Sequence, residues 1–102
     1  MLKTSIRFFE DIPVRAVWND DTSKWWFCAM DIAEALTKSS NPRSYWNALK
    51  WRKNELSTIC RQLKLKANDG KSYLTDVVDE NGVTLITALI PAKNKENFSR
   101  WV

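Results

Sequence analysis

Alternating apolar and polar residues predict three strands near the N-terminus. Each run is rich in β-branched or aromatic residues, and the runs cover residues 3–9, 13–18 and 25–29. Pro13 has no amide hydrogen to donate, so it suits the start of the second strand. The breaks between the runs are short and polar, which favours an antiparallel hairpin or meander.

Helical spacing replaces this alternation over residues 31–37, where the apolar side chains fall on one face. Asp31 lies in the first turn of this predicted helix, where the helix dipole favours an acid. A longer helix is predicted over residues 42–56. Asn41 suits its N-cap and Pro42 its first position, because the fixed φ of proline matches a helix start.

The predicted 42–56 helix has two chemically different sides. The side expected to be buried consists of Tyr45, Ala48, Leu49, Arg52 and Leu56. The opposite side is basic and rich in amides, has Trp46 and Trp51 beside it, and consists of Arg43, Asn47, Lys50 and Asn54. This helix therefore presents hydrogen-bond donors to the outside.

A second hairpin is predicted over residues 61–74. Residues 62–67 alternate between polar and apolar types, as a half-buried strand does. Asp69-Gly70 follows, a pair that favours a tight turn with positive φ.

Helical spacing returns in the last third of the chain. Thr75 is predicted to cap a helix with an acidic first turn, and Pro91 to end it. Residues 92–102 predict a last short helix with Phe98 and Trp101 on one face. This pattern stops in mid-course, so we expect the chain to be part of a longer protein with a further C-terminal domain.

Together these elements predict one α+β domain over residues 1–102. It would be a small antiparallel sheet of two hairpins, packed by three to four short helices. A chain of 102 residues suits a single domain. No apolar run has the length of a membrane span and the N-terminus lacks a signal-peptide pattern, so we expect a cytoplasmic protein with no membrane contact.

The formal net charge of +4 is unevenly distributed along the chain. Residues 38–66 hold eight bases against Glu55 alone, a net charge of +7, whereas residues 10–37 have a net charge of −4. Concentrated positive charge attracts polyanions. A basic helix face is also common on surfaces that only meet solvent, so composition by itself leaves both interpretations open.

The chain contains no histidine, which excludes Ser-His-Asp and Cys-His nucleophiles and the common zinc sites. Asp76, Asp79 and Glu80 lie close together in the sequence. They fit a helix cap and first-turn acids better than a magnesium site, which needs carboxylates converging on one point. We therefore expect no catalytic residue, no metal and no cofactor.

Two cysteines are present, and in a cytosolic protein both are expected to be reduced. Cys28 lies in a predicted strand and is interpreted as a thiol of the core. Cys60 precedes Arg61, a neighbour that would lower its pKa, so a reactive role is left open there.

Three stretches, in order along the chain, resemble motifs of one family. Residues 26–36, WFCAMDIAEAL, resemble a Trp-Phe strand running into an Asp-x-Ala-x-x-Leu helix. Residues 80–86, ENGVTLI, resemble a Glu-x-Gly-Leu-Tyr-x-Leu helix start, and residues 95–102, KENFSRWV, resemble a closing Ala-x-x-Phe-x-x-Trp-Val helix. With the hairpin over residues 6–17 they cover nearly the whole chain. The family is the BRO N-terminal domain of phage and prophage antirepressors and of large DNA viruses.

This resemblance implies a DNA-binding regulatory domain of a prophage antirepressor-like protein, encoded by a phage or by a prophage in a bacterium. It favours double-stranded DNA as the partner of the basic region over residues 41–66. Arginine pairs with guanine edges, asparagine with adenine edges and lysine with phosphates. The candidate DNA-binding residues are Arg43, Asn47, Lys50, Lys53, Arg61, Lys64 and Lys66.

The alternative is a protein-interaction module that binds and inactivates a repressor or another DNA-associated protein without contacting DNA. The acidic stretch over residues 10–37 would complement a basic repressor. Exposed tryptophan often marks a protein interface. Trp25, expected to point outward because Trp26 points inward, and Trp51 are the candidates. A homodimer is also considered, since DNA readers often pair two half-sites.

Overall fold

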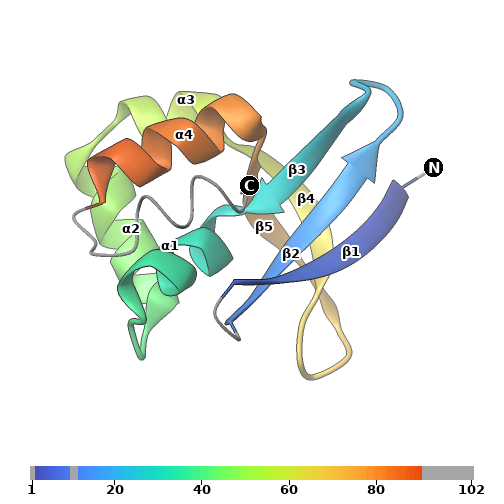
Figure 1. Cartoon of the computed structure of the whole chain (residues 1–102), viewed down its shortest axis with the longest axis horizontal. Coiled ribbons are helices and arrows are strands. Elements are labelled where there is room, and N and C mark those ends of the chain that lie inside the picture. Colours follow the sequence, from blue (N-terminus) through green and yellow to red (C-terminus); the bar gives the residue numbers. More distant parts are fainter. Residues whose placement is uncertain (1, 10–11, 91–102) are drawn as a thin grey trace.

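The chain folds into an antiparallel sheet accompanied by four helices, in a computed structural model that describes residues 2–9 and 12–90 (Figure 1). This confirms the predicted α+β class. In chain order the elements are β1 (Leu2–Phe9), β2 (Ile12–Asn19), β3 (Lys24–Cys28), α1 (Ala29–Thr37), α2 (Pro42–Arg52), α3 (Glu55–Ile59), β4 (Arg61–Lys66), β5 (Ser72–Val78) and α4 (Glu80–Leu89).

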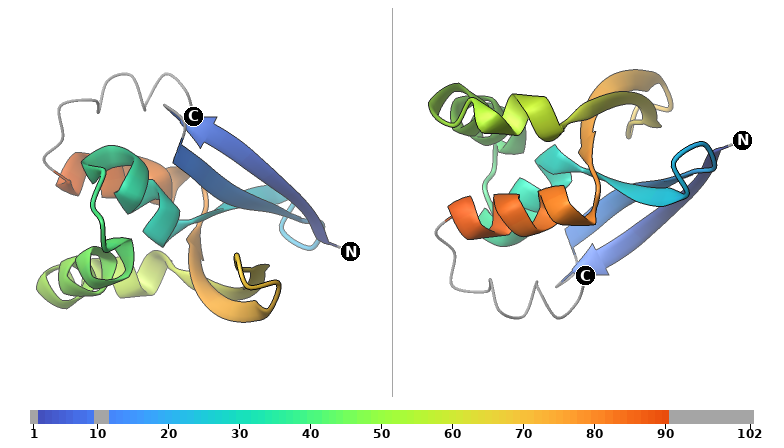
Figure 2. Two further views of the ribbon diagram at one scale, coloured as in Figure 1. Left: turned by 90° about the horizontal axis from the view of Figure 1, so that it is seen from below. Right: turned by 90° about the horizontal axis from the view of Figure 1, so that it is seen from above.

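The five strands lie in the order β1-β2-β3-β5-β4, and each strand runs antiparallel to its neighbour. The first three strands form a meander and β4–β5 a separate hairpin, so the sheet has one hairpin more than the two predicted. β3 and β5 join through two residue pairs, Phe27 with Val78 and Cys28 with Val77. Because this junction is short, the β4–β5 hairpin diverges from the first three strands (Figure 2).

The helices gather at one side of the sheet (Figure 1). The main core joins Phe27 and Val78 of the sheet to Ile32 of α1 and Ile86 of α4. A smaller cluster, on the other face of β3, contains Val17, Trp26, Cys28, Leu65 and Val77. Trp26 and Phe27 thus point to opposite faces of the sheet, as successive residues of a strand must.

Local sequence signals place the helix starts and the tight turn. The Asn41 side chain accepts the N–H of Ser44 at 3.2 Å, and Pro42 opens α2, as predicted. α1 begins at Ala29, two residues before the predicted start. Gly70 has a φ of +84° in the turn between β4 and β5, which confirms that hairpin.

The prediction of one helix over residues 42–56 was wrong, because the helix breaks. α2 ends at Arg52 and the short α3 begins at Glu55. At the break Lys53 leaves the helical conformation, with φ −124° and ψ 83°. Leu56 of α3 is fully buried and joins the main core.

The prediction that Thr75 caps a helix was also wrong. β5 runs on from Ser72 to Val78, and Thr75 pairs with Leu63 of β4. Val77 and Val78 are both buried, one on each face of the sheet, which favours strand over helix here. The true cap of α4 is Asp79, whose side chain accepts the N–H of Gly82 at 3.0 Å. Pro91 and the predicted 92–102 helix lie outside the described residues.

Candidate nucleic-acid interface

The described residues form an open groove of about 1020 Å³. One wall is α2, and the facing wall is the β4–β5 hairpin. The start of α1 and parts of β1 and β2 close the remaining side. The groove thus occupies the space that opens where the β4–β5 hairpin leaves the rest of the sheet.

Arg43 and Asn47 belong to the α2 wall of the groove. They lie four residues apart and therefore share one side of the helix. Both side chains are exposed, and neither has a side-chain hydrogen bond or ion pair with the residues that the structure describes. Their donor groups are therefore available to a ligand in the groove.

Lys50 lies one turn further along α2, and its charge is already engaged. Its Nζ lies 2.5 Å from Oδ2 of Asp76 on β5. The same carboxylate accepts Nε1–H of Trp46 at 2.8 Å and a weaker bond from Gln62 at 3.3 Å. Burial opposes ionisation of Asp76, but the hydrogen bonds from Lys50, Trp46 and Gln62 outweigh it and hold its pKa below the usual value.

The position of Trp46 shows that the buried and exposed sides of α2 were predicted wrongly. It was expected beside the exposed polar side, but it is only 3% exposed, while Ala48 and Arg52 of the predicted buried side face solvent. Asp76 explains the difference, because it gives the indole N–H a partner inside the protein. The buried stripe of α2 is therefore Trp46 and Leu49.

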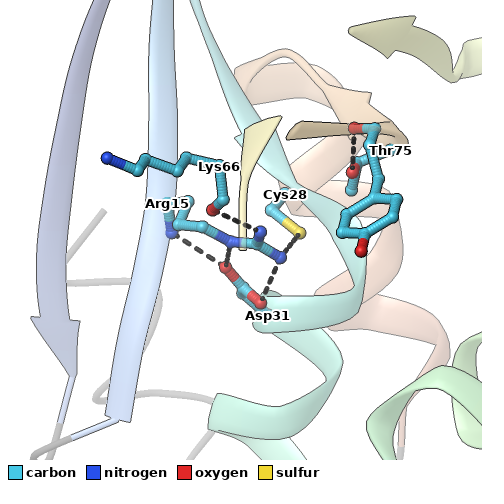
Figure 3. A network of polar contacts seen from close by, with 6 residues as sticks. Arg15, Cys28, Asp31, Lys66 and Thr75 are labelled. Atoms are coloured by element: carbon cyan, nitrogen blue, oxygen red, sulfur yellow. Dashed lines mark hydrogen bonds and ion pairs between the residues drawn. The ribbon is translucent and has the colours of Figure 1, made fainter. Parts of the chain in front are cut away.

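The hairpin wall contributes Lys66 and the turn that follows it. Lys66 is exposed and lines the groove beside Asn68. A backbone bond from Ala67 to the carbonyl of Lys71 closes the turn at 2.8 Å. Lys66 thus contributes to the lining from a second element, and its side chain extends toward β2 (Figure 3).

A partly buried ion pair lies at the base of the groove (Figure 3). Arg15 of β2 donates Nε–H to Oδ2 of Asp31 at 2.8 Å and Nη2–H to Oδ1 at 3.2 Å. Its own backbone N–H also reaches Asp31, at 3.0 Å. Asp31 had been predicted as a first-turn acid, and it does lie in the first turn of α1, but its main partner is Arg15.

Arg15 also ties the base of the groove to the hairpin. Its Nη1–H donates to the backbone carbonyl of Lys66 at 3.2 Å, and its Nη2–H contacts Sγ of Cys28 at 3.3 Å (Figure 3). Burial disfavours its charge, but the hydrogen bonds to Asp31 outweigh this and raise the pKa of Arg15. One guanidinium therefore fixes α1, β3 and the end of β4 relative to one another.

The structure brings together four of the seven candidate DNA-binding residues. Arg43, Asn47, Lys50 and Lys66 line the groove. Lys53 follows the last residue of α2 and Lys64 lies on β4; both are exposed but outside the lining. Arg61 is placed elsewhere, with its guanidinium 4.9 Å from the ring centre of Trp26 on the other face of β4.

The two candidate interface tryptophans have different surroundings. Trp51 is 85% exposed, which agrees with the prediction of an outward-facing side chain. Trp25 does point away from Trp26, but it is half-buried. Trp18 packs against it edge to face and the Arg7 guanidinium lies 4.9 Å above its ring, so Trp25 was wrongly expected to be openly exposed.

Sequence reasoning missed the apolar part of the groove and the role of Arg15. Ile6, Tyr73 and Leu74 line the groove although they are 59%, 46% and 61% exposed. For these side chains the sequence held no signal beyond strand alternation. For Arg15 the sequence did hold a signal. An arginine between Val14 and Ala16 of an apolar strand requires an acidic partner when it is buried.

The thiols are unreactive by environment, and no metal cluster is present in the described part of the chain. Cys28 and Cys60 are free, and burial raises the pKa of Cys28 to about 12 and that of Cys60 to about 11. The expected lowering of the Cys60 pKa by Arg61 was therefore wrong. Within residues 2–9 and 12–90, no three His, Cys, Asp or Glu side chains come together as metal ligands. No helix among these residues is long and apolar enough to span a membrane.

Comparison with known families places the chain. The model of the BRO family, N-terminal domain, matches residues 13–102, which is most of the sequence. The chain belongs to the BRO family. No match to this BRO domain was found among curated proteins or among solved structures. Membership confirms the resemblance in the strand and helix motifs, and it makes this a regulatory domain of the BRO type.

Proposed function

We propose that this BRO domain binds double-stranded DNA along the α2 side of the groove, with the β4–β5 hairpin against the same duplex. The observation that carries the proposal is the placement of Arg43, Asn47 and Lys66. They come from two elements and line one groove, and their side chains have no hydrogen bond or ion pair with the residues that the structure describes. Family membership supports the same function, because BRO N-terminal domains are DNA-binding-like regulatory domains in general.

The roles of these residues follow from their chemistry. Arg43 can form two parallel bonds to a guanine edge, and Asn47 can do the same at adenine. Lys66, Lys64 and Lys53 suit phosphates, which position a protein on the duplex without reading its sequence. Lys50 contributes less to binding than the others, since Asp76 already neutralises it. Arg61 lies on the far face of β4 and would meet DNA only beyond the groove.

A protein partner is the second candidate function, and the groove itself gives a reason to consider it. Ile6, Tyr73 and Leu74 place apolar surface in the lining, and Trp51 stands exposed at the end of α2. Apolar and aromatic anchors of this kind are typical of protein interfaces. A repressor could dock there without any DNA contact. Binding by such anchors would depend little on salt.

Salt dependence separates the two functions. A fluorescently labelled duplex of random sequence is titrated with the domain at several salt concentrations, and binding is followed by fluorescence anisotropy. With three phosphate contacts, from Lys53, Lys64 and Lys66, log K should fall against log salt with a slope of roughly −3. Absence of duplex binding at low salt would contradict the DNA proposal. Capture of a repressor at high salt that depends on Trp51 would then support the protein-interaction function.

A further inference from the structure

A second, smaller pocket lies away from the groove, where the β2–β3 turn meets the start of α4. Its volume is about 250 Å³. Pockets that hold whole small molecules measure roughly 300–1,000 Å³, so this one suits a single side chain. It shares no lining residue with the groove. Its lining consists of Trp18, Ser23, Lys24, Trp25, Asp79, Glu80 and Asn81.

Two indole rings form aromatic walls of this pocket. The ring centres of Trp18 and Trp25 lie 5.7 Å apart, and the ring planes meet at 65°. Trp18 is held in place by a 2.7 Å bond from its Nε1–H to Asp20. The faces of indole rings attract cations, and Trp25 already does so within the protein, where the Arg7 guanidinium lies over it. Arg7 is not part of the pocket lining.

The charge around the pocket is opposite to that of the chain as a whole. Four acids, Asp20, Asp21, Asp79 and Glu80, stand against Lys24 and Arg7, a local net charge of −2 in a chain of +4. Such a region repels nucleic acid and attracts basic groups. It therefore cannot belong to the DNA surface.

The two carboxylates of the pocket lining, those of Asp79 and Glu80, differ in their contacts. Asp79 accepts the N–H of Gly82 through Oδ1 and the Lys24 ammonium at 3.2 Å through Oδ2, so its charge serves the start of α4. Glu80 is exposed, and its carboxylate has no hydrogen bond or ion pair among the residues that the structure describes. Glu80 is therefore the group that can pair with an incoming cation.

We propose that this pocket receives a basic side chain, arginine or lysine, of a partner protein. The cation would lie against the Trp18 and Trp25 rings and pair with the Glu80 carboxylate. This goes beyond DNA binding and does not rest on it, because the two sites share no residue. With both sites occupied, the domain would hold DNA in the groove and a basic protein at the pocket.

The test uses capped amino acids as probes of the side chain in a protein. N-acetyl-arginine amide is titrated into the 102-residue domain, and the indole N–H signals of its tryptophans are followed by two-dimensional ¹H–¹⁵N NMR. N-acetyl-citrulline amide, a neutral probe of nearly the same shape, is the control ligand. We expect saturable shifts at Trp18 and Trp25 with the arginine probe only. The distant Trp51 signal should stay unchanged.

Matched variants test the role assigned to Glu80. Glu80→Gln should weaken binding of the arginine probe about fivefold or more, since it removes the ionic partner. Glu55→Gln is the control, because Glu55 is likewise an exposed first-turn glutamate, at the start of α3. Trp18→Leu should abolish the shift at Trp25, which remains as a reporter.

Several results would overturn the proposal. These are equal shifts with both probes, unsaturable shifts, the same effect from Glu80→Gln and Glu55→Gln, or no shift at all. Duplex binding is measured on the Glu80→Gln variant as well, and it should be unchanged. Failure of the pocket would then be distinguishable from failure of the DNA proposal.

Discussion

The ammonium of Lys50 on α2 lies 2.5 Å from a carboxylate oxygen of Asp76 on β5. With Trp46 and Gln62 on the same carboxylate, Asp76 receives donors from α2 and β4 at once. Both walls of the groove are thereby fixed by one side chain. The ion pair with Asp76 also neutralises the Lys50 ammonium, one of the positive charges of α2.

Asp76→Asn should lower the free energy of unfolding by about 1–3 kcal/mol. The amide still accepts one bond, but it loses the charge that strengthens the bonds from Lys50 and Trp46. Urea denaturation at neutral pH measures the change. Asp21→Asn, in the exposed β2–β3 turn, is the control and should differ from the wild type by less than about 0.5 kcal/mol. Equal stability of both variants would contradict the role assigned to Asp76.

The stabilisation by Asp76 should also depend on pH. Its pKa is lowered from the usual 3.8 in the folded protein. The contribution is therefore complete above the unfolded value and is lost as the pH falls through the lower folded pKa. The stability difference between wild type and Asp76→Asn should narrow as urea denaturation is repeated from about pH 5 down to about pH 2.5. A difference that stays constant over this range would refute the linkage.

Gly82→Ala should destabilise the domain by about 1–3 kcal/mol, although alanine is the better helix former. A Cβ at this buried position in α4 would lie 2.5 Å from Cβ of Val78. Helix and strand would have to move apart. Thermal unfolding followed by circular dichroism measures the loss. Thr84→Ala, at an exposed position on the same helix, is the control and should have a much smaller effect. This contact also explains the glycine of the ENGVTLI motif.

Both thiols should react slowly with a disulfide reagent at neutral pH. Burial raises the pKa of Cys28 to about 12 and that of Cys60 to about 11, which leaves little thiolate. We expect rates on the order of a hundredfold below those of the same chain in denaturant. Cys60 should react before Cys28, because Cys60 is half-buried and Cys28 has no exposed surface. Fast reaction of Cys60 in the folded protein would contradict the raised pKa and would favour a reactive role for this thiol.

The sequence specified much of the fold through local signals. Strand alternation, the Asn41-Pro42 helix start and the Asp69-Gly70 turn each act within a few residues, so all three could be predicted. The helix break at Lys53 and the length of β5 could not. The length of β5 depends on two adjacent valines, Val77 and Val78, which enter cores that other segments build on the two faces of the sheet. Nothing in the structure explains the helix break.

The sequence predicted which residues belong to the candidate site better than it predicted how they are arranged in space. Arg43 and Asn47 were found because helical spacing places them on one side of α2. The burial of Trp46 and the ion pair of Lys50 were missed because their partner Asp76 lies 26 or more residues away and was assigned to the acidic start of a helix. Contacts at such separation leave no trace in local spacing.

Duplex affinity of two charge-matched double variants tests the central claim most directly. Arg43→Ala/Lys66→Ala removes two basic side chains of the groove that have no ion pair with the described residues. Arg52→Ala/Lys71→Ala removes two exposed basic side chains outside the groove lining. Anisotropy with a labelled duplex at about 0.1 M salt should show a loss of at least about tenfold for the first variant and less than about threefold for the second. Equal losses for the two variants would contradict a DNA site in the groove.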